Sequence, residues 1–143
     1  MASAMKKYAA LLAVPTVVGA GVFGGGTAAY AGPSSPPATA AAWSCPAGAI
    51  CFWDDFGGVG QRCYWYQADD DWLAGNLVCP WSDEKPVKSV FNNGRSPAYT
   101  GVAFYSSAGF VDRKGCTRQG QKGNLRGDYK VRSHRWIQSS CGS

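Results

Sequence analysis

Residues 52–60 (FWDDFGGVG) and 104–112 (FYSSAGFVD) carry one pattern, written twice at a distance of 52 positions. Both begin with Phe and a second aromatic residue, continue with two polar residues, and place Gly sixth and Val eighth. An aromatic-rich segment that stops at a Gly-containing turn is typical of a β-strand leading into a tight turn. The repetition therefore predicts two copies of one β unit.

Further tripeptides recur in the same order along the two copies. They are GNL at 75–77 and 123–125, and VKS at 87–89 with VRS at 131–133. The offset between copies falls from 52 to 48 and then to 44, so the second copy has shorter connections, which loops readily tolerate. We expect a first repeat over about 45–93 and a second over about 101–137.

The secondary structure expected from this pattern is almost entirely β. Strand-like segments, rich in apolar and aromatic residues, occur at 49–55, 61–67, 86–91, 101–107 and 129–137. The Asp-rich stretch 69–76 could form a short helical turn, capped by Asp69 or Asp70 and ended by Gly75. No stretch keeps an apolar period of 3.6 residues. These features predict an all-β sandwich of two Greek-key motifs.

The N-terminal region has the composition of a secretory signal. Lys6 and Lys7 precede a long apolar run, and the run ends in an A-x-A site that predicts cleavage after Ala31. We therefore expect a signal peptide at 1–31 and a flexible Pro-, Ser- and Ala-rich leader at 32–42. A single secreted, extracellular domain would occupy 43–143, with no membrane span in the mature protein.

Six cysteines follow the predicted signal peptide: Cys45, Cys51, Cys63, Cys79, Cys116 and Cys141. An even number in a small secreted domain indicates disulfides. There is no C-x-x-C pair, and His134 is the only histidine, so a zinc site has poor support in the sequence. The count alone leaves the pairing of the cysteines open.

Positive charge is concentrated in the second half of the chain. Residues 32–100 contain four Lys/Arg and seven Asp/Glu, a net charge of −3, whereas residues 101–143 contain eight and two, a net charge of +6. This asymmetry indicates either a solvated surface or an affinity for an anionic cell-wall polymer or an acidic protein.

The repeated phrase resembles the Greek-key signature of the βγ-crystallin superfamily, in which two aromatic residues precede a Gly. The first copy has Trp53 and Gly60 but places Gly58 where the second aromatic residue belongs. The second copy has both aromatic residues, yet it ends in Asp112 where the signature has Gly. Asp accepts left-handed backbone angles better than most residues, so we expect Asp112 to be tolerated.

The segment CPAGAIC at 45–51 directly precedes the first phrase. Together they resemble the secreted bacterial peptidase-inhibitor family typified by the Streptomyces metalloproteinase inhibitor. The resemblance covers about residues 43–137 and implies a disulfide-stabilised βγ-crystallin-like domain that is not an enzyme. It also implies a monomer whose partner is a secreted peptidase, with a metallopeptidase or another peptidase as the target.

The resemblance implies a reactive loop in the second half, within 114–124. Its candidate residues are Cys116, Thr117 and Arg118, although no second cysteine lies close enough to close a small loop. The family's opening motif implies the disulfide Cys45–Cys51. Keeping the remaining bridges within one repeat each gives Cys63–Cys79 and Cys116–Cys141.

Crystallin-type calcium binding is not expected. The final Ser of that calcium motif matches Ser89 and Ser133, but Lys88 and Arg132 occupy the positions of the required hydroxyl ligands. A fixed cation there would repel calcium, which needs oxygen ligands.

Catalysis, cofactor binding and nucleic-acid binding also find little support. The chain has no Ser-centred elbow, no H-E-x-x-H motif, no P-loop and no dinucleotide fingerprint. We therefore expect no enzymatic activity, no cofactor and no nucleic-acid partner. Most aromatic residues should be in the core, although an exposed Trp65 or Trp72 could stack on a sugar ring. A basic cell-envelope-binding or antimicrobial protein is the alternative to an inhibitor.

Overall fold

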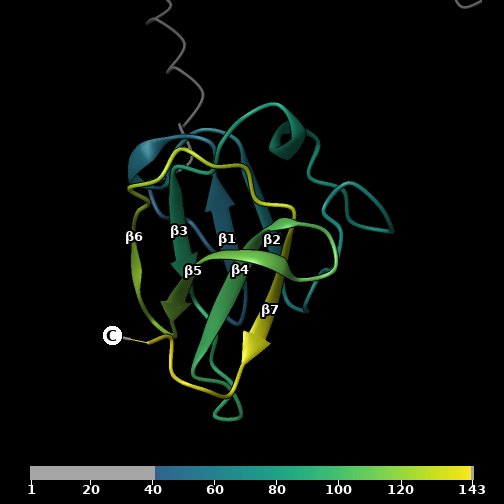
Figure 1. The fold of residues 1–143 in the computed structure, drawn as a ribbon. Helices are drawn as coiled ribbons and strands as arrows, with labels where there is room; N and C mark the ends of the chain where they lie inside the picture. The colour runs from purple at the N-terminus through teal and green to yellow at the C-terminus, as the bar shows by residue number, and fades with distance from the viewer. Residues whose placement is uncertain (1–40, 143) are drawn as a thin grey trace, which may run out of the picture. The chain divides into compact units, whose positions relative to one another are not determined.

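The computed structural model describes residues 41–142 (Figure 1). The predicted signal peptide at 1–31 and the leader up to residue 40 lie outside the described residues. Within residues 41–142 the protein is all-β, with two antiparallel sheets, two short 3₁₀ turns and no α-helix. The described region accordingly holds no helix with the length and apolar character needed to cross a membrane.

The first sheet has four strands in the order β2-β1-β3-β6. They are β1 (Ile50–Trp53), β2 (Arg62–Trp65), β3 (Ser89–Asn92) and β6 (Lys122–Asn124). The second sheet has the order β5-β4-β7. It consists of β4 (Gly101–Ser107), β5 (Val111–Arg118) and β7 (Ser133–Ile137). The 3₁₀ turns are η1 (Phe56–Gly58) and η2 (Pro80–Asp83).

The two halves of the chain exchange segments between the sheets. Strand β6 belongs to the second repeat but pairs with β3 of the first, Val90 lying opposite Gly123. In the other direction, Asp69 of the first repeat forms an isolated bridge to His134 in β7. Each repeat therefore supplies a piece of the other repeat's sheet.

Aromatic side chains from both repeats form the core between the sheets. The equivalent residues Phe52 and Phe104 meet edge-on with ring centroids 5.7 Å apart. Trp65 and Trp72 stack at 4.5 Å and are buried, so neither is exposed to stack on a sugar. The sugar-stacking alternative for these two residues is wrong, because burying a Trp ring in this small core is more favourable than leaving it in water.

The predicted strands are present, and two further strands occur where the sequence indicated a loop. Residues 111–118 and 122–124 form β5 and β6, which carry mostly polar side chains and Gly and thus lack an apolar alternation. The predicted helical turn at 69–76 is an irregular segment instead. Its Asp69 carboxylate accepts a hydrogen bond from the Asp71 amide, and that of Asp71 accepts one from the Leu73 amide. The Asp residues thus cap a turn and not a helix.

Three disulfides connect the six cysteines, and none is free. They are Cys45–Cys51, Cys63–Cys79 and Cys116–Cys141, the same three pairs that the sequence analysis expects. The second joins β2 to the residue before η2, and the third joins β5 to the C-terminal segment.

The repeated phrase forms the same folded-over turn in both copies. Positive φ angles occur at equivalent positions, 68° at Gly58 and 62° at Phe110, then 88° at Gly60 and 63° at Asp112. The expectation that Asp112 tolerates a left-handed conformation is confirmed.

A serine hydroxyl fastens each turn to its sheet. Ser89 Oγ accepts a hydrogen bond from the Gly58 amide, and Ser133 Oγ accepts one from the Phe110 amide. Both hydroxyls also donate to a backbone carbonyl of the turn. The serines that resemble calcium-motif positions therefore serve as structural anchors.

Candidate functional site

The predicted reactive residues Cys116, Thr117 and Arg118 do not lie in a loop. They are the last three residues of β5 and pair with Ala103, Val102 and Gly101 of β4, respectively. Thr117 is buried, and its carbonyl accepts a hydrogen bond of 2.9 Å from the Asn92 side chain. A peptidase needs an accessible backbone around the bond it cuts, so the loop assignment is corrected: only Arg118 presents an exposed side chain.

A different segment, 74–78 (AGNLV), has the exposure that the predicted loop lacks. All five residues are exposed, and they lie between Trp72 and Cys79, which are both completely buried. Leu77 and Val78 are each 47% exposed, and adjacent exposed aliphatic side chains form an apolar surface patch. Figure 1 shows the segment between β2 and β3, coloured teal, projecting from the domain beside β2.

The N-terminal end of this exposed segment is held by Trp72. Its indole Nε1 donates to His134 Nδ1 at 2.8 Å, and the other ring nitrogen of His134 lies 2.9 Å from the Gln67 carbonyl. Burial lowers the pKa of His134 to about 4, while the hydrogen bond with the Gln67 carbonyl acts in the opposite direction. His134 is thus a neutral structural residue at pH 7, which accepts a hydrogen bond from the Trp72 indole N–H and is completely buried.

An ion pair reinforces the same end. The guanidinium of Arg132 contacts both carboxylate oxygens of Asp71, and the Trp72 amide donates to the Arg132 carbonyl at 2.8 Å. Hydrogen bonds from Arg132 and from the Leu73 amide hold the pKa of Asp71 below its ordinary value. Arg132, predicted to exclude calcium, therefore positions the base of the exposed segment.

The C-terminal end is fixed by Cys79. Its disulfide to Cys63 ties the segment to β2, and its amide donates to the Trp72 carbonyl at 2.8 Å, which closes the base of the loop. Pro80 then begins η2, where its fixed φ favours the turn. Both ends of the five-residue segment are consequently rigid.

A shallow groove of about 640 Å³ runs beside the exposed segment. Tyr64 and Tyr66 of the β2 region line it together with Leu77 and Val78. The two tyrosine rings meet edge-on at 6.0 Å, and the guanidinium of Arg62 lies over the Tyr64 ring at 4.9 Å. Exposed Tyr and Arg side chains of this kind are enriched in protein–protein interfaces.

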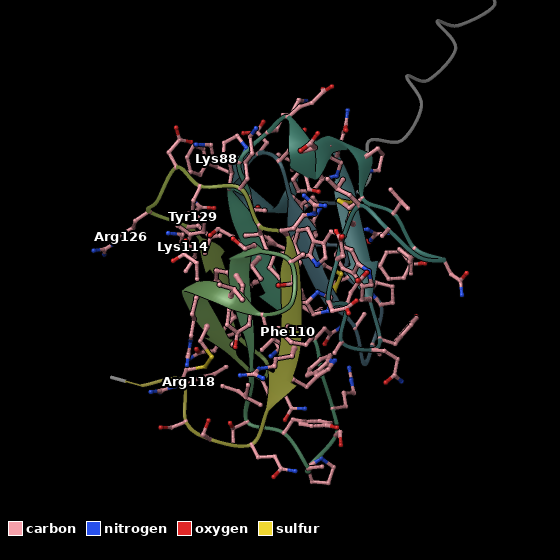
Figure 2. All side chains as sticks on the ribbon, turned by 45° about the vertical axis from the view of Figure 1, so that its right-hand side comes forward. Lys88, Phe110, Lys114, Arg118, Arg126 and Tyr129 are labelled. Atoms are coloured by element: carbon pink, nitrogen blue, oxygen red, sulfur yellow. A yellow bond between two sulfur atoms is a disulfide. The ribbon has the colours of Figure 1, made fainter. Side chains whose placement is uncertain are left out.

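A separate basic surface lies on another part of the domain. Figure 2 shows Lys88, Lys114, Arg118 and Arg126 along one side, with Tyr129 among them. Lys88 and Lys114 pair with Asp128 and Asp112, whereas Arg118 and Arg126 form no ion pair within residues 41–142. Two unpaired guanidinium groups thus remain available on this surface.

Metal ligands are not gathered anywhere in the described part of the chain. Residues 41–142 contain no group of three His, Cys, Asp or Glu side chains that could hold an ion. The ammonium group of Lys88 lies 2.5 Å from an Asp128 carboxylate oxygen and 5.4 Å from the centre of the Phe56 ring.

Segment 74–78 was not predicted as a site because the family resemblance places the reactive loop in the second repeat, whereas this segment lies in the first. The available signal was the pair Leu77–Val78 after Gly75 and Asn76, directly before a cysteine. A flexible, turn-forming pair followed by two aliphatic residues without a strand partner marks an exposed apolar loop.

Comparison with protein families gives one match. The family model described as "Peptidase inhibitor family I36" matches residues 38–118, more than half of the chain. The matched region includes the first two disulfides, the exposed segment and all of β5. Comparisons with curated proteins and with solved structures gave no match.

Proposed function

The chain belongs to peptidase inhibitor family I36, and on that premise we propose that it is a secreted, non-enzymatic inhibitor of an extracellular peptidase. The target is a metallopeptidase or another secreted peptidase, and the inhibitor acts as a monomeric domain that begins near residue 43. The observation that carries this proposal is the exposed segment 74–78, held at both ends by buried residues. A substrate-like segment whose two ends are already fixed binds a cleft with a smaller entropic cost than a free peptide.

Secretion is supported by the chemistry of the cysteines and by the N-terminal sequence. Three disulfides are stable in an oxidising compartment, and residues 1–31 have the pattern of a signal peptide. A non-enzymatic role is supported by His134, because a fully buried imidazole that is hydrogen-bonded on both sides does not act as an exchangeable acid or base.

Titration against two peptidases tests this function. The mature protein is added in increasing amounts to a thermolysin-type metallopeptidase and to a subtilisin-type serine peptidase. We expect a stoichiometric loss of activity in at least one of them. Unchanged activity of both enzymes at a large molar excess of the protein would contradict the proposal.

Arg118 is the second contact that we propose, through its exposed guanidinium alone and not through a cleavable bond, because its backbone pairs with Gly101 of β4. It is the one exposed member of the predicted reactive group and ends strand β5. A trypsin-like peptidase recognises a positive side chain, so such an enzyme belongs in the same titration. Arg118→Ala should abolish inhibition of that enzyme if Arg118 makes the contact.

Binding to an anionic polymer is the alternative function, favoured by the unpaired Arg118 and Arg126 on the basic surface. Retention on anionic cell-wall material should then fall with moderate salt, because salt screens exposed charges. The double substitution of Arg118 and Arg126 by Ala should reduce the retention. Retention that is independent of salt would count against this alternative.

A further inference from the structure

We infer that the exposed segment 74–78 enters the peptidase cleft and presents the Asn76–Leu77 bond, with Leu77 filling an apolar pocket just after that bond. The inference rests on the proposed inhibitory function and narrows it to one partner class. That class comprises secreted metallopeptidases that prefer a large apolar residue on the C-terminal side of the bond they cut.

The backbone of the segment is free to pair with a partner. Within residues 41–142, the N–H and C=O groups of 75–78 make no hydrogen bond, although the residues on either side do. A peptide bound in a cleft gains affinity through main-chain hydrogen bonds and specificity through side-chain pockets. In contrast, the backbone around Thr117 is already engaged with Val102 and Asn92.

The side chains of the segment suit a cleft with an apolar pocket. Ala74, Gly75 and Asn76 are small and precede the bond, whereas Leu77 and Val78 are aliphatic and follow it. Exposed aliphatic groups gain free energy when a pocket removes them from water. The segment contains no charged side chain, so a cleft that requires Arg or Lys at the bond would find none here.

The surroundings of the segment favour tight and slow-releasing binding. The anchors Trp72 and Cys79 reduce the freedom lost on binding, and Tyr64 and Tyr66 beside Leu77 add a second contact surface. The two ends of the segment are therefore already fixed to the domain when the segment meets the partner.

The Cys63–Cys79 disulfide also spans the proposed bond. If water attacks the Asn76 carbonyl carbon, the C–N bond to Leu77 breaks, Asn76 gains a carboxylate, and the Leu77 nitrogen takes up a proton as an amine. Cys63 lies on one side of this bond and Cys79 on the other, only two residues past Leu77. A cut chain would thus stay in one piece, with both new ends held near the cleft.

Inhibition constants of matched variants test the assignment. Leu77→Asp places a charge in the apolar pocket and should raise the inhibition constant for a thermolysin-type peptidase by roughly 100-fold or more. Leu77→Phe should keep inhibition within about tenfold, since that pocket accepts large apolar groups. The control is Val111→Asp, which puts the same charge on an exposed aliphatic residue of β5 and should leave inhibition within about twofold.

Cleavage mapping supplies a readout that does not depend on inhibition. After prolonged incubation with the peptidase, the unreduced protein should gain the mass of one water and, once reduced, separate into fragments ending at Asn76 and beginning at Leu77. If the wild type inhibits but Leu77→Asp inhibits equally well, the segment is not the site while the proposed function stands.

The remaining outcomes separate the two ideas further. Rapid cutting at Asn76–Leu77 without inhibition would refute the inhibitory function and leave the segment as the part that enters the cleft. A wild type that neither inhibits any tested peptidase nor is cut at this bond would overturn both.

Discussion

The indole of Trp43 packs edge-on against Trp53 with ring centroids 5.7 Å apart, as Phe110 packs against Tyr105 at 5.9 Å. Trp53 and Tyr105 are equivalent residues of the two repeats, and Gly58 stands where the second repeat has Phe110. Trp43, from the segment before the first strand, therefore fills the place of the aromatic residue that the first repeat lacks. The cation–π contacts of the two rings also correspond: the Lys122 ammonium lies over the Trp43 ring, and the Arg135 guanidinium lies over the Phe110 ring.

Removing the Trp43 ring should destabilise the domain. We expect Trp43→Ala to lower the free energy of unfolding by about 1–3 kcal/mol, less than for a fully buried Trp because Trp43 is only partly buried. Urea denaturation measures this change. Val111→Ala, at an exposed strand position, is the control and should change stability by less than about 0.5 kcal/mol. Equal effects of the two substitutions would contradict the role of Trp43.

A Phe introduced at position 58 should restore the packing against Trp53 that is lost when the Trp43 ring is removed. A Cβ at Gly58 would lie 2.6 Å from the Trp43 ring, so Gly58→Phe alone should be strongly destabilising. A Trp43→Ala background removes the ring contact, although the backbone nitrogen of residue 43 would still lie 2.7 Å from that Cβ, so the segment at residue 43 has to shift to accept the new side chain. Phe110 shows that Phe accepts the same positive φ in this turn. A double-mutant cycle should give a favourable coupling of about 1–3 kcal/mol. Additive effects would show that the two positions are not equivalent.

Acid should destabilise the protein through His134. Its pKa is about 4 in the folded protein and about 6.5 when unfolded, so the unfolded state binds more protons between these pH values. Stability is full above pH 6.5 and should fall by about 3 kcal/mol as the pH drops to 4. The lowered pKa values of Asp71 and Asp112 add losses only below their ordinary value of 3.8.

Urea denaturation as a function of pH measures this loss. His134→Gln is the informative variant, because its amide can accept from Trp72 and donate to Gln67 without titrating. Its stability should be nearly independent of pH between 6.5 and 4. A wild-type curve that is equally flat in this range would refute the assignment.

Enlarging Thr117 should harm the fold without improving inhibition. Thr117 is 8% exposed and lies opposite Val102 in the second sheet, so a Phe ring has to displace packed neighbours. We expect Thr117→Phe to cost about 1–3 kcal/mol of stability in thermal or urea unfolding. Arg118→Ala, at the neighbouring exposed position, should be nearly neutral. Tighter inhibition of a thermolysin-type peptidase by Thr117→Phe would restore β5 as the reactive region.

Calcium should leave the melting temperature unchanged. An ion that binds only the folded state would raise it. Lys88 and Arg132 directly precede the two motif serines in the sequence and pair with Asp128 and Asp71, and the serine hydroxyls are engaged with the backbone of the turns. Thermal unfolding in millimolar calcium and in excess chelator should coincide. A rise of several degrees with calcium would reveal an oxygen-ligand site that these cations do not block.

The sequence predicted the architecture well because the repeat carries strong local signals. The phrases at 52–60 and 104–112 contain the residues of the two turns that adopt positive φ, and their first residues, Phe52 and Phe104, lie in the core. Strands β5 and β6 could not be predicted in the same way. Edge strands bury few side chains, so their sequence shows no apolar alternation, and pairing with β4 and β3 defines them.

The site was harder to predict because exposure is a property of the whole fold. Cys116 suggested a loop by resemblance, yet Thr117 is buried under contacts from Asn92 and Val102, which are distant in sequence. Conversely, nothing local to 74–78 reveals that Trp72 reaches His134, 62 residues away, and so holds the base of the segment. Likewise, the replacement of a missing aromatic residue by Trp43 required the three-dimensional arrangement.

The exchange of segments between the sheets determines when each sheet can be completed during synthesis. A ribosome releases the first repeat long before β6, so the first sheet waits without its fourth strand until residues 122–124 have emerged. The bridge from Asp69 forms later still, once the strand containing His134 has been synthesised. Neither half is therefore a complete folding unit, and a nascent chain halted near residue 100 would expose unpaired strand edges to its neighbours.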